Sequence, residues 1–258
     1  MTHVTDSGYS PGTIIVAAGI QPRYYEFQLS LDSIAAPSGT KLHIERSCDI
    51  TQNFNNGVKK MEGEWAWFLG DDHSFSPTLL LWLLQRNVDV VVPITPCKSP
   101  PWMPCVMHGP VWHEEMPLYT WDELSGHDLF ELPKGDFIGQ AGMLVKKTVL
   151  DKIGYPWFKA GQMDPGRLQE DLTFCREIQQ LGYTVHIDQD VIFDHFFPIS
   201  ITARRHAGRW VPAMVTGTGN VMVLPDVTRG MDRNTEYKGV SRIDWAADPA
   251  VEVLNEAD

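Results

Sequence analysis

Residues 68–77 read FLGDDHSFSP, an apolar run that meets two acids and a histidine. The apolar residues predict a buried strand, and Ser76 followed by Pro77 predicts the start of a helix. Two neighbouring carboxylates at the end of a buried strand repel one another and are costly to desolvate. We therefore expect a cation or a bound substrate to compensate Asp71 and Asp72.

The segments on both sides alternate between strand and helix patterns. Apolar runs predict strands at residues 13–19, 65–70 and 89–94, and the alternating segment KLHIER predicts one at residues 41–46. Helical spacing predicts helices over residues 24–36, 53–64 and 77–87. The strand DVVVPI at residues 89–94 has almost no polar residue, which is typical of a parallel sheet covered on both faces. This order predicts an α/β sheet of the nucleotide-binding kind.

The second half continues the pattern after a proline-rich loop at residues 95–112, expected to cross the top of the sheet. A strand and a short helix are predicted within residues 135–154, a helix over 170–182 and a last strand over 183–188. From Pro225 the periodicity is lost. We therefore predict one domain over residues 1–224 and a C-terminal extension or flap over residues 225–258.

Composition excludes several classes of protein. A chain of 258 residues with 43% hydrophobic residues forms a real core, and a net charge of −12 argues against nucleic-acid binding through a basic surface. The four cysteines are scattered without a CxxC pair, which indicates neither a zinc ribbon nor a disulfide framework and favours a reducing cytoplasm. No secretory leader or membrane-spanning run is expected.

The acid cluster is a candidate metal site. Ligands of α/β sheets bind at the carboxyl edge of the strands, where the cluster falls. If the chain turns there, Asp71 and His73 converge on one divalent cation and Asp72 is left for a ribose hydroxyl or water. Oxygen and imidazole ligands favour Mn²⁺ or another first-row ion over Ca²⁺, with Mg²⁺ also possible. The alternative is that an acid caps the following helix and His73 lies on the surface.

The order of motifs along the chain resembles the GT-A glycosyltransferases of the family-2-like type. An acid cluster ends a strand, a glycine-containing strand follows at Gly139 to Val145, Glu170 and Asp171 open a helix, and His195 follows the next strand. The resemblance covers about residues 13–209. It implies a GT-A fold, which is a Rossmann-like mixed sheet flanked by helices, built as a single domain with a C-terminal extension.

The resemblance also implies a function. Such enzymes are hexosyltransferases that move a sugar from a nucleotide diphosphate donor, most often UDP-linked, to a hydroxyl acceptor with the help of Mn²⁺ or Mg²⁺. The small build is similar to that of bacterial and bacteriophage enzymes, which implies the cytoplasm of a bacterium or of an infected host cell. The acceptor is a glycan, a protein or a hydroxymethylated DNA base.

Site residues follow from the resemblance one by one. Asp71, His73 and His195 match the metal ligands, in an Asp-x-His variant similar to that of polypeptide N-acetylgalactosaminyltransferases. A histidine packed against neighbouring phenylalanines is the alternative for His195. Asp171 matches the base that deprotonates the acceptor and Glu170 a sugar or acceptor contact, the alternative being acids that complement the helix dipole. The donor-binding candidates are Asp72, Arg46, Asn53, Asn56, Arg204 and Arg205.

Other functions stay open at this point. One is a nucleotide-sugar-binding protein without turnover. Another is a nucleotidyltransferase, against which the absence of a glycine-rich basic loop after TIIVAAG argues. The acidic balance argues mildly against DNA as the acceptor, although Lys98, Arg204, Arg205 and Arg209 would form a local basic groove. The stereochemical outcome, inversion or retention, does not follow from the spacing.

Overall fold

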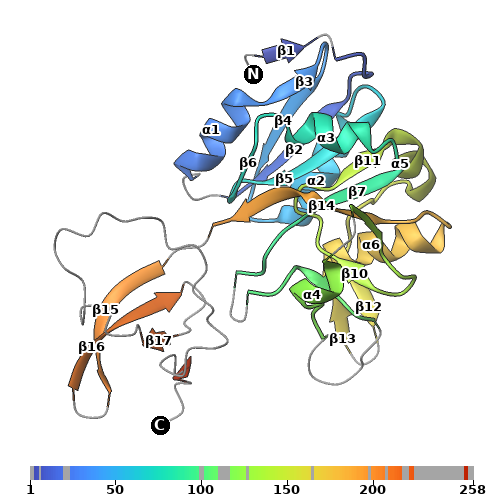
Figure 1. The fold of residues 1–258 in the computed structure, drawn as a ribbon. Helices are drawn as coiled ribbons and strands as arrows, with labels where there is room; N and C mark the ends of the chain where they lie inside the picture. The colour runs from blue at the N-terminus through green and yellow to red at the C-terminus, as the bar shows by residue number, and fades with distance from the viewer. Residues whose placement is uncertain are drawn as a thin grey trace. The chain divides into compact units, whose positions relative to one another are not determined.

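The chain divides into two compact units, residues 1–196 and 197–258. The structure is a computed structural model, and it describes residues 3–5, 7–19, 24–98, 102–109, 117–125, 128–163, 166–196, 199–206, 209–216, 221–223 and 253–254 (Figure 1). The domain boundary predicted after residue 224 lies in residues 224–252, which are not among the described residues. This boundary therefore remains a prediction.

Unit 1 is built on a mixed sheet with the strand order β4-β2-β5-β11-β7-β14-β6, in which β9 also pairs with β14. Its strands are β2 (Thr13–Ala18), β4 (Lys41–Arg46), β5 (Trp65–Gly70), β6 (His73–Phe75), β7 (Val90–Ile94), β9 (Leu129–Glu131), β11 (Leu144–Lys146) and β14 (His186–His195). β2 is parallel to β4 and β5, and β14 is parallel to β7, whereas β11 is antiparallel to both β5 and β7. The predicted α/β class with a mixed sheet flanked by helices is confirmed.

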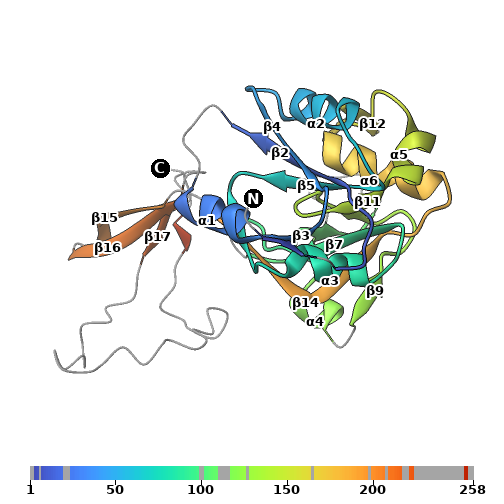
Figure 2. The same cartoon turned by 90° about the horizontal axis from the view of Figure 1, so that it is seen from above.

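Helices cover both faces of this sheet because its strands carry apolar side chains on both sides. On β2, Ile15 and Ala17 face one core, and Ile14 and Val16 face the other, as the period of two requires. The first core is closed by α2 (Ile50–Lys59), α5 (Lys147–Ile153) and α6 (Glu170–Gln180) and the second by α1 (Tyr25–Ser33) and α3 (Leu79–Gln85). Figure 2 shows α2, α5 and α6 on one side of the sheet.

The strand order creates a switch point at the carboxyl edge. The chain leaves β2 for β4 on one side and returns to β5 on the other side, with all three strands parallel. Because β2 and β5 are parallel neighbours, the loops that follow them leave the same edge of the sheet, which is where ligands of open α/β sheets bind. Gly19 follows β2, and Asp71 and Asp72 follow β5 at this place.

The structure corrects the start of the helix predicted after Pro77. α3 begins at Leu79 with Thr78 as its N-cap, and the residues before it form the short strand β6. The Ser76 hydroxyl still accepts a hydrogen bond from the Thr78 backbone N–H at 3.3 Å, so it closes a turn instead of capping the helix. A three-residue strand is too short to be recognised by periodicity, and its pairing with the distant β14 decides its conformation.

Other boundaries differ by a few residues. α2 begins at Ile50, earlier than predicted, because the Asp49 side chain accepts a hydrogen bond from the Gln52 backbone N–H and caps it. α3 buries Leu79, Leu80 and Leu83, whereas Trp82 is half exposed. The strand predicted to end at Asp188 runs on to His195 as β14, which brings its last residue to β6.

Unit 2 contains an antiparallel sheet of its own with the strand order β15-β16-β17-β18. Its strands are β15 (Ile199–His206), β16 (Arg209–Thr216), β17 (Val221–Val223) and β18 (Val253–Leu254). Over the described residues of the whole chain, no helix combines the length and the apolarity that crossing a bilayer requires.

Candidate metal and catalytic site

Two histidines meet because β6 and β14 pair. In this antiparallel pair His73 lies directly opposite His195, and their rings stack with centroids 4.4 Å apart. Phe193 stacks on the His73 ring at 4.5 Å. Asp72 immediately precedes β6, and its backbone carbonyl accepts the N–H of Phe196 at 2.7 Å. Residues 122 positions apart in the sequence thus form one cluster, the Asp72–His73–His195 cluster, whose ligand atoms all lie within 4.8 Å of one another.

The imidazole nitrogens are arranged as metal ligands require. Nδ1 of His195 lies 2.9 Å from the carbonyl oxygen of Pro96, and because a carbonyl only accepts, Nδ1 carries the proton. The other ring nitrogen, Nε2, faces Asp72, 3.8 Å from Oδ2. Backbone carbonyls fix the tautomer of metal-binding histidines in the same way.

The second histidine has an unused nitrogen. His73 is 4% exposed, and its Nε2 has no hydrogen-bond partner among the residues that the structure describes. Its Nδ1 lies 2.9 Å from Asp72 Oδ1, in a direction that makes no aligned hydrogen bond. A buried nitrogen without a partner is costly, and a bound cation would satisfy it. The residues present therefore fit a divalent metal ion.

The charge state of the cluster suits a cation. Burial raises the pKa of Asp72, but the imidazoles of His195 and His73 and the ammonium of Lys98, which lie against its carboxylate, outweigh burial and hold that pKa well below its usual range. Burial also lowers the pKa of His73, although Asp72 opposes the shift. The cluster thus offers one carboxylate and neutral imidazole, a donor set that suits first-row divalent ions. Lys98 donates to Asp72 and balances its charge.

Gly70, which ends β5 two residues before Asp72, lies closely against the cluster. A Cβ atom on Gly70 would lie 2.8 Å from Asp72 Oδ1 and 3.2 Å from the His73 ring. We expect Gly70→Ala to push both side chains apart and to weaken Mn²⁺ binding about 10- to 100-fold, the range seen when support of metal ligands is lost. Isothermal titration of Mn²⁺ measures this, with an unchanged circular dichroism spectrum as the control. Unchanged affinity in the folded variant would show that the cluster does not need this close approach.

Two further predicted site residues, Asp71 and Arg46, lie at the switch point after β2. The backbone N–H of Gly19 donates to Asp71 Oδ2 at 3.1 Å, and the Gly19 carbonyl accepts from Arg46 Nε at 3.1 Å. Asp71 and Arg46 therefore flank the loop after β2. Asp71 does not belong to the Asp72–His73–His195 cluster, whose carboxylate is Asp72. The assignments of Asp71 as a ligand and of Asp72 as a donor contact remain predictions.

The two asparagines of α2 that are predicted to bind the donor have different surroundings. Asn53 is 2% exposed, and its side-chain amide donates to the backbone carbonyls of Ala18 and Ser47. Its oxygen accepts from the Ser47 hydroxyl at 2.8 Å. Asn53 thus ties together the loops after β2 and β4. Asn56 lies half-buried on the same helix. Their role in donor binding stays a prediction.

The predicted base, Asp171, lies in the first turn of α6. Burial raises the pKa of Asp171 to about 6, with a smaller contribution from Glu170, while the hydrogen bond from the Leu172 backbone N–H opposes the shift. The Gly139 backbone N–H donates to the Cys105 carbonyl at 3.3 Å, a Cβ atom on Gly139 would lie 3.4 Å from Asp171 Oδ2, and Lys98 contacts Asp72. Asp171 is therefore close to the proline-rich loop that contacts the cluster. A carboxylate with a pKa near neutrality is typical of a general base.

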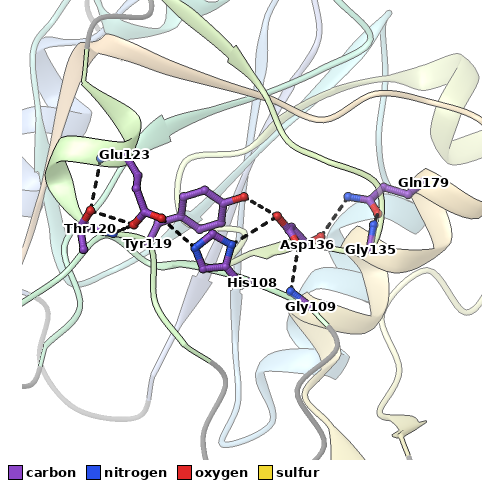
Figure 3. A network of polar contacts seen from close by, with 8 residues as sticks. All are labelled: His108, Gly109, Tyr119, Thr120, Glu123, Gly135, Asp136 and Gln179. Atoms are coloured by element: carbon purple, nitrogen blue, oxygen red, sulfur yellow. Dashed lines mark hydrogen bonds and ion pairs between the residues drawn. The ribbon is translucent and has the colours of Figure 1, made fainter.

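A polar network around Asp136 connects α6 to residues 108–123 (Figure 3). Asp136 accepts hydrogen bonds from the Tyr119 hydroxyl and the Gly109 backbone N–H, and His108 lies between Asp136 and Glu123. The Asp136 carbonyl accepts from Gln179 on α6 at 3.0 Å. The network connects α6 to the segments that follow the proline-rich loop, which positions the helix that carries Asp171.

Two predicted residues belong to the other unit. Arg204 and Arg205 lie on β15 of unit 2, and the structure describes the backbone there but not the side chains. Their contact with a donor remains a prediction. Sequence reasoning treated Lys98 only as part of a basic groove and did not consider the Pro96 carbonyl. Neither has a sequence signal, because their contacts depend on how the proline-rich loop folds back.

No family model matches the chain, and no curated protein sequence matches it. Among solved structures, it is similar to A197 from STIV, with 12% identity, a TM-score of 0.43 and coverage of 86% of this chain and 99% of that one. It is also similar to the inositol-1-phosphate CTP transferase from T. maritima, with 9% identity, a TM-score of 0.36 and coverage of 71% and 69%. At this level of similarity, the function must be argued from the site.

Proposed function

We propose that the protein is a metal-dependent glycosyltransferase, which moves a hexose from a nucleotide diphosphate sugar, with UDP as the nucleotide, to a hydroxyl acceptor. One observation carries the proposal: Asp72, His73 and His195 converge beside the switch point of the sheet, where nucleotide ligands of this architecture bind. The acceptor is a glycan, a protein or a hydroxymethylated base of DNA.

The cluster would hold Mn²⁺ or Mg²⁺, which neutralises the charge that develops on the diphosphate as the bond to the sugar C1 breaks. Within the protein, Lys98 has a second role. It pairs with Asp72 and would add a charge-assisted hydrogen bond to the diphosphate of a donor held beside the cluster.

Asp171 would accept the proton of the acceptor hydroxyl. A carboxylate with a pKa of about 6 is ionised at neutral pH yet basic enough to take a proton in the transition state. Glu170 would contact the sugar or the acceptor from the same helix turn. Arg46, Asn53 and Asn56 would bind the donor at the loops after β2 and β4. Arg204 and Arg205 of unit 2 are the remaining donor-binding candidates.

The test is calorimetric titration of UDP, UDP-glucose, UDP-galactose and UDP-N-acetylhexosamines into the protein, with Mn²⁺ and with EDTA. We expect one donor to bind only with Mn²⁺, and His195→Ala to lose this binding at least 10-fold, because the variant lacks one of three ligands. His186→Ala is the matched control, since His186 lies on the same strand and its Nδ1 contacts the Val90 carbonyl. Its donor affinity is expected to be unchanged.

Other outcomes separate the rival functions. Release of UDP as the sugar is transferred, slowly to water or faster to an acceptor, supports a transferase. Metal-dependent binding without any release supports a nucleotide-sugar-binding protein. Formation of pyrophosphate from a nucleoside triphosphate supports a nucleotidyltransferase. Donor affinity that is unchanged both by removal of Mn²⁺ and by His195→Ala would refute the role of the Asp72–His73–His195 cluster in donor binding.

A further inference from the structure

Two cysteines meet in the proline-rich loop between β7 and β8 (Val106–Met107). Its arms pair through a bridge between Pro96 and Pro104, with the Cys97 N–H donating to the Met103 carbonyl and the Cys105 N–H to the Thr95 carbonyl, both at 2.8 Å. This pairing places the Sγ atoms of Cys97 and Cys105 3.3 Å apart. Both residues are half-buried, whereas Cys48 is exposed and Cys175 is buried.

The two thiols differ in reactivity. The hydrogen bond between them lowers the pKa of the Cys97 thiol and raises that of the Cys105 thiol. Cys97 is therefore the better nucleophile toward an oxidant, since the thiolate is the reactive form. Cys105 lies in position to resolve the oxidised sulfur. An accessible cysteine next to a resolving cysteine is the arrangement that redox-sensitive proteins use.

The neighbours of Cys97 on both sides contact the metal cluster. The Pro96 carbonyl accepts the hydrogen bond from His195 Nδ1, and the Lys98 ammonium donates to Asp72. A disulfide requires the two sulfurs to lie about 2.05 Å apart with a defined dihedral angle, so its formation constrains the two arms of the loop that carry them. The groups that orient His195 and balance Asp72 flank Cys97 on one of these constrained arms.

We propose that Cys97 and Cys105 form a reversible disulfide, a modification site that weakens cation binding by the Asp72–His73–His195 cluster. The oxidant is a peroxide. The Cys97 thiolate attacks one peroxide oxygen, and the O–O bond breaks to give a sulfenic acid and hydroxide, which takes a proton to form water. The Cys105 sulfur then attacks the Cys97 sulfur, and the S–O bond breaks as a second water leaves. Two thiols are oxidised and one peroxide is reduced, and an added dithiol reverses the change.

The first test is independent of any metal. The full-length chain is treated with hydrogen peroxide and mapped by mass spectrometry without reduction. We expect one crosslinked peptide pair, which joins Cys97 to Cys105 with the loss of two hydrogen atoms, and Cys48 still open to alkylation. Cys97→Ser and Cys105→Ser should abolish the crosslink, and Cys48→Ser, the matched control, should keep it. Separate oxidation of the two sulfurs without a crosslink would overturn the proposal.

The second test concerns the coupling, which rests on the proposed metal site. Mn²⁺ alone is titrated into the reduced protein, the oxidised protein and the oxidised protein after reduction and desalting. We expect oxidation to raise the Kd about 10-fold and reduction to restore it, as with other changes in the support of metal ligands. Equal affinities in both states overturn the coupling. Absence of Mn²⁺ binding in the reduced protein refutes the proposed metal site instead, and the crosslink result stays valid.

Discussion

Replacing Asp171 with asparagine is expected to lower the transfer rate about 10²- to 10⁴-fold while leaving donor affinity nearly unchanged. This is the usual contribution of a general base, which acts in the transition state and not in binding. In the unmodified protein, kcat/KM is expected to fall as the pH drops through about 6, because Asp171 becomes protonated there. Initial rates of UDP release between pH 5 and 8 measure both effects.

The same substitution is expected to stabilise the protein at neutral pH. Burial raises the pKa of Asp171 to about 6 in the folded state, above an ordinary value of about 4. The folded form therefore binds the proton more tightly than the unfolded chain, and stability is lost as the pH rises from about 4 to 6. Asp171→Asn removes this loss. The gain in free energy of unfolding should be near zero at pH 4 and about 2–3 kcal/mol at pH 7.

Urea unfolding at the two pH values tests the gain, with Glu177→Gln as the matched control. Glu177 lies on the same helix and pairs with Lys159 at 2.7 Å on the surface, so its loss should change stability by less than about 1 kcal/mol at either pH. If Asp171→Asn kept full activity, another group would be the base. If it destabilised the protein at pH 7, Asp171 would have a structural role.

The largest loss of stability is expected for Arg86→Met. Arg86 at the end of α3 donates to both carboxylate oxygens of Asp188 on β14, at 2.7 and 2.9 Å, and Asp188 is fully buried. Asp188 also raises the pKa of Arg86, which keeps the guanidinium charged. Methionine keeps the apolar stem but leaves a buried carboxylate without its partner, which costs about 3–5 kcal/mol. Denaturant unfolding at pH 7 measures the loss.

Asp190→Asn provides the control for this prediction. Asp190 contacts the same guanidinium at 2.7 Å, but its side chain is 51% exposed. Solvent screens such a pair, so its removal should cost less than about 1 kcal/mol. Combining Arg86→Met with Asp188→Leu should recover much of the loss, because no buried charge remains. A small cost for Arg86→Met alone would mean that water or another residue compensates Asp188.

Much of the fold could be predicted from the sequence because local patterns carry it. Strands β2, β5 and β7 coincide with apolar runs, since a sheet covered on both faces leaves few polar positions, and β4 coincides with an alternating run. The helix α6 and its termination at Gly182, which has a φ of +88°, also follow from the local sequence, because glycine adopts this conformation readily. The antiparallel insertion of β11 between β5 and β7 has no such pattern and was not predicted.

The sequence by itself determined that acids and histidines of unit 1 end strands in an α/β sheet, because strand ends and residue types can be read locally. Only the tertiary structure decided that Asp72, rather than Asp71, joins His73 and His195, and that Cys97 meets Cys105. The physical reason is the same in both cases. Each contact depends on the pairing of short strands across a turn or across more than a hundred residues, and such pairing is decided by packing and hydrogen bonds that no local pattern encodes.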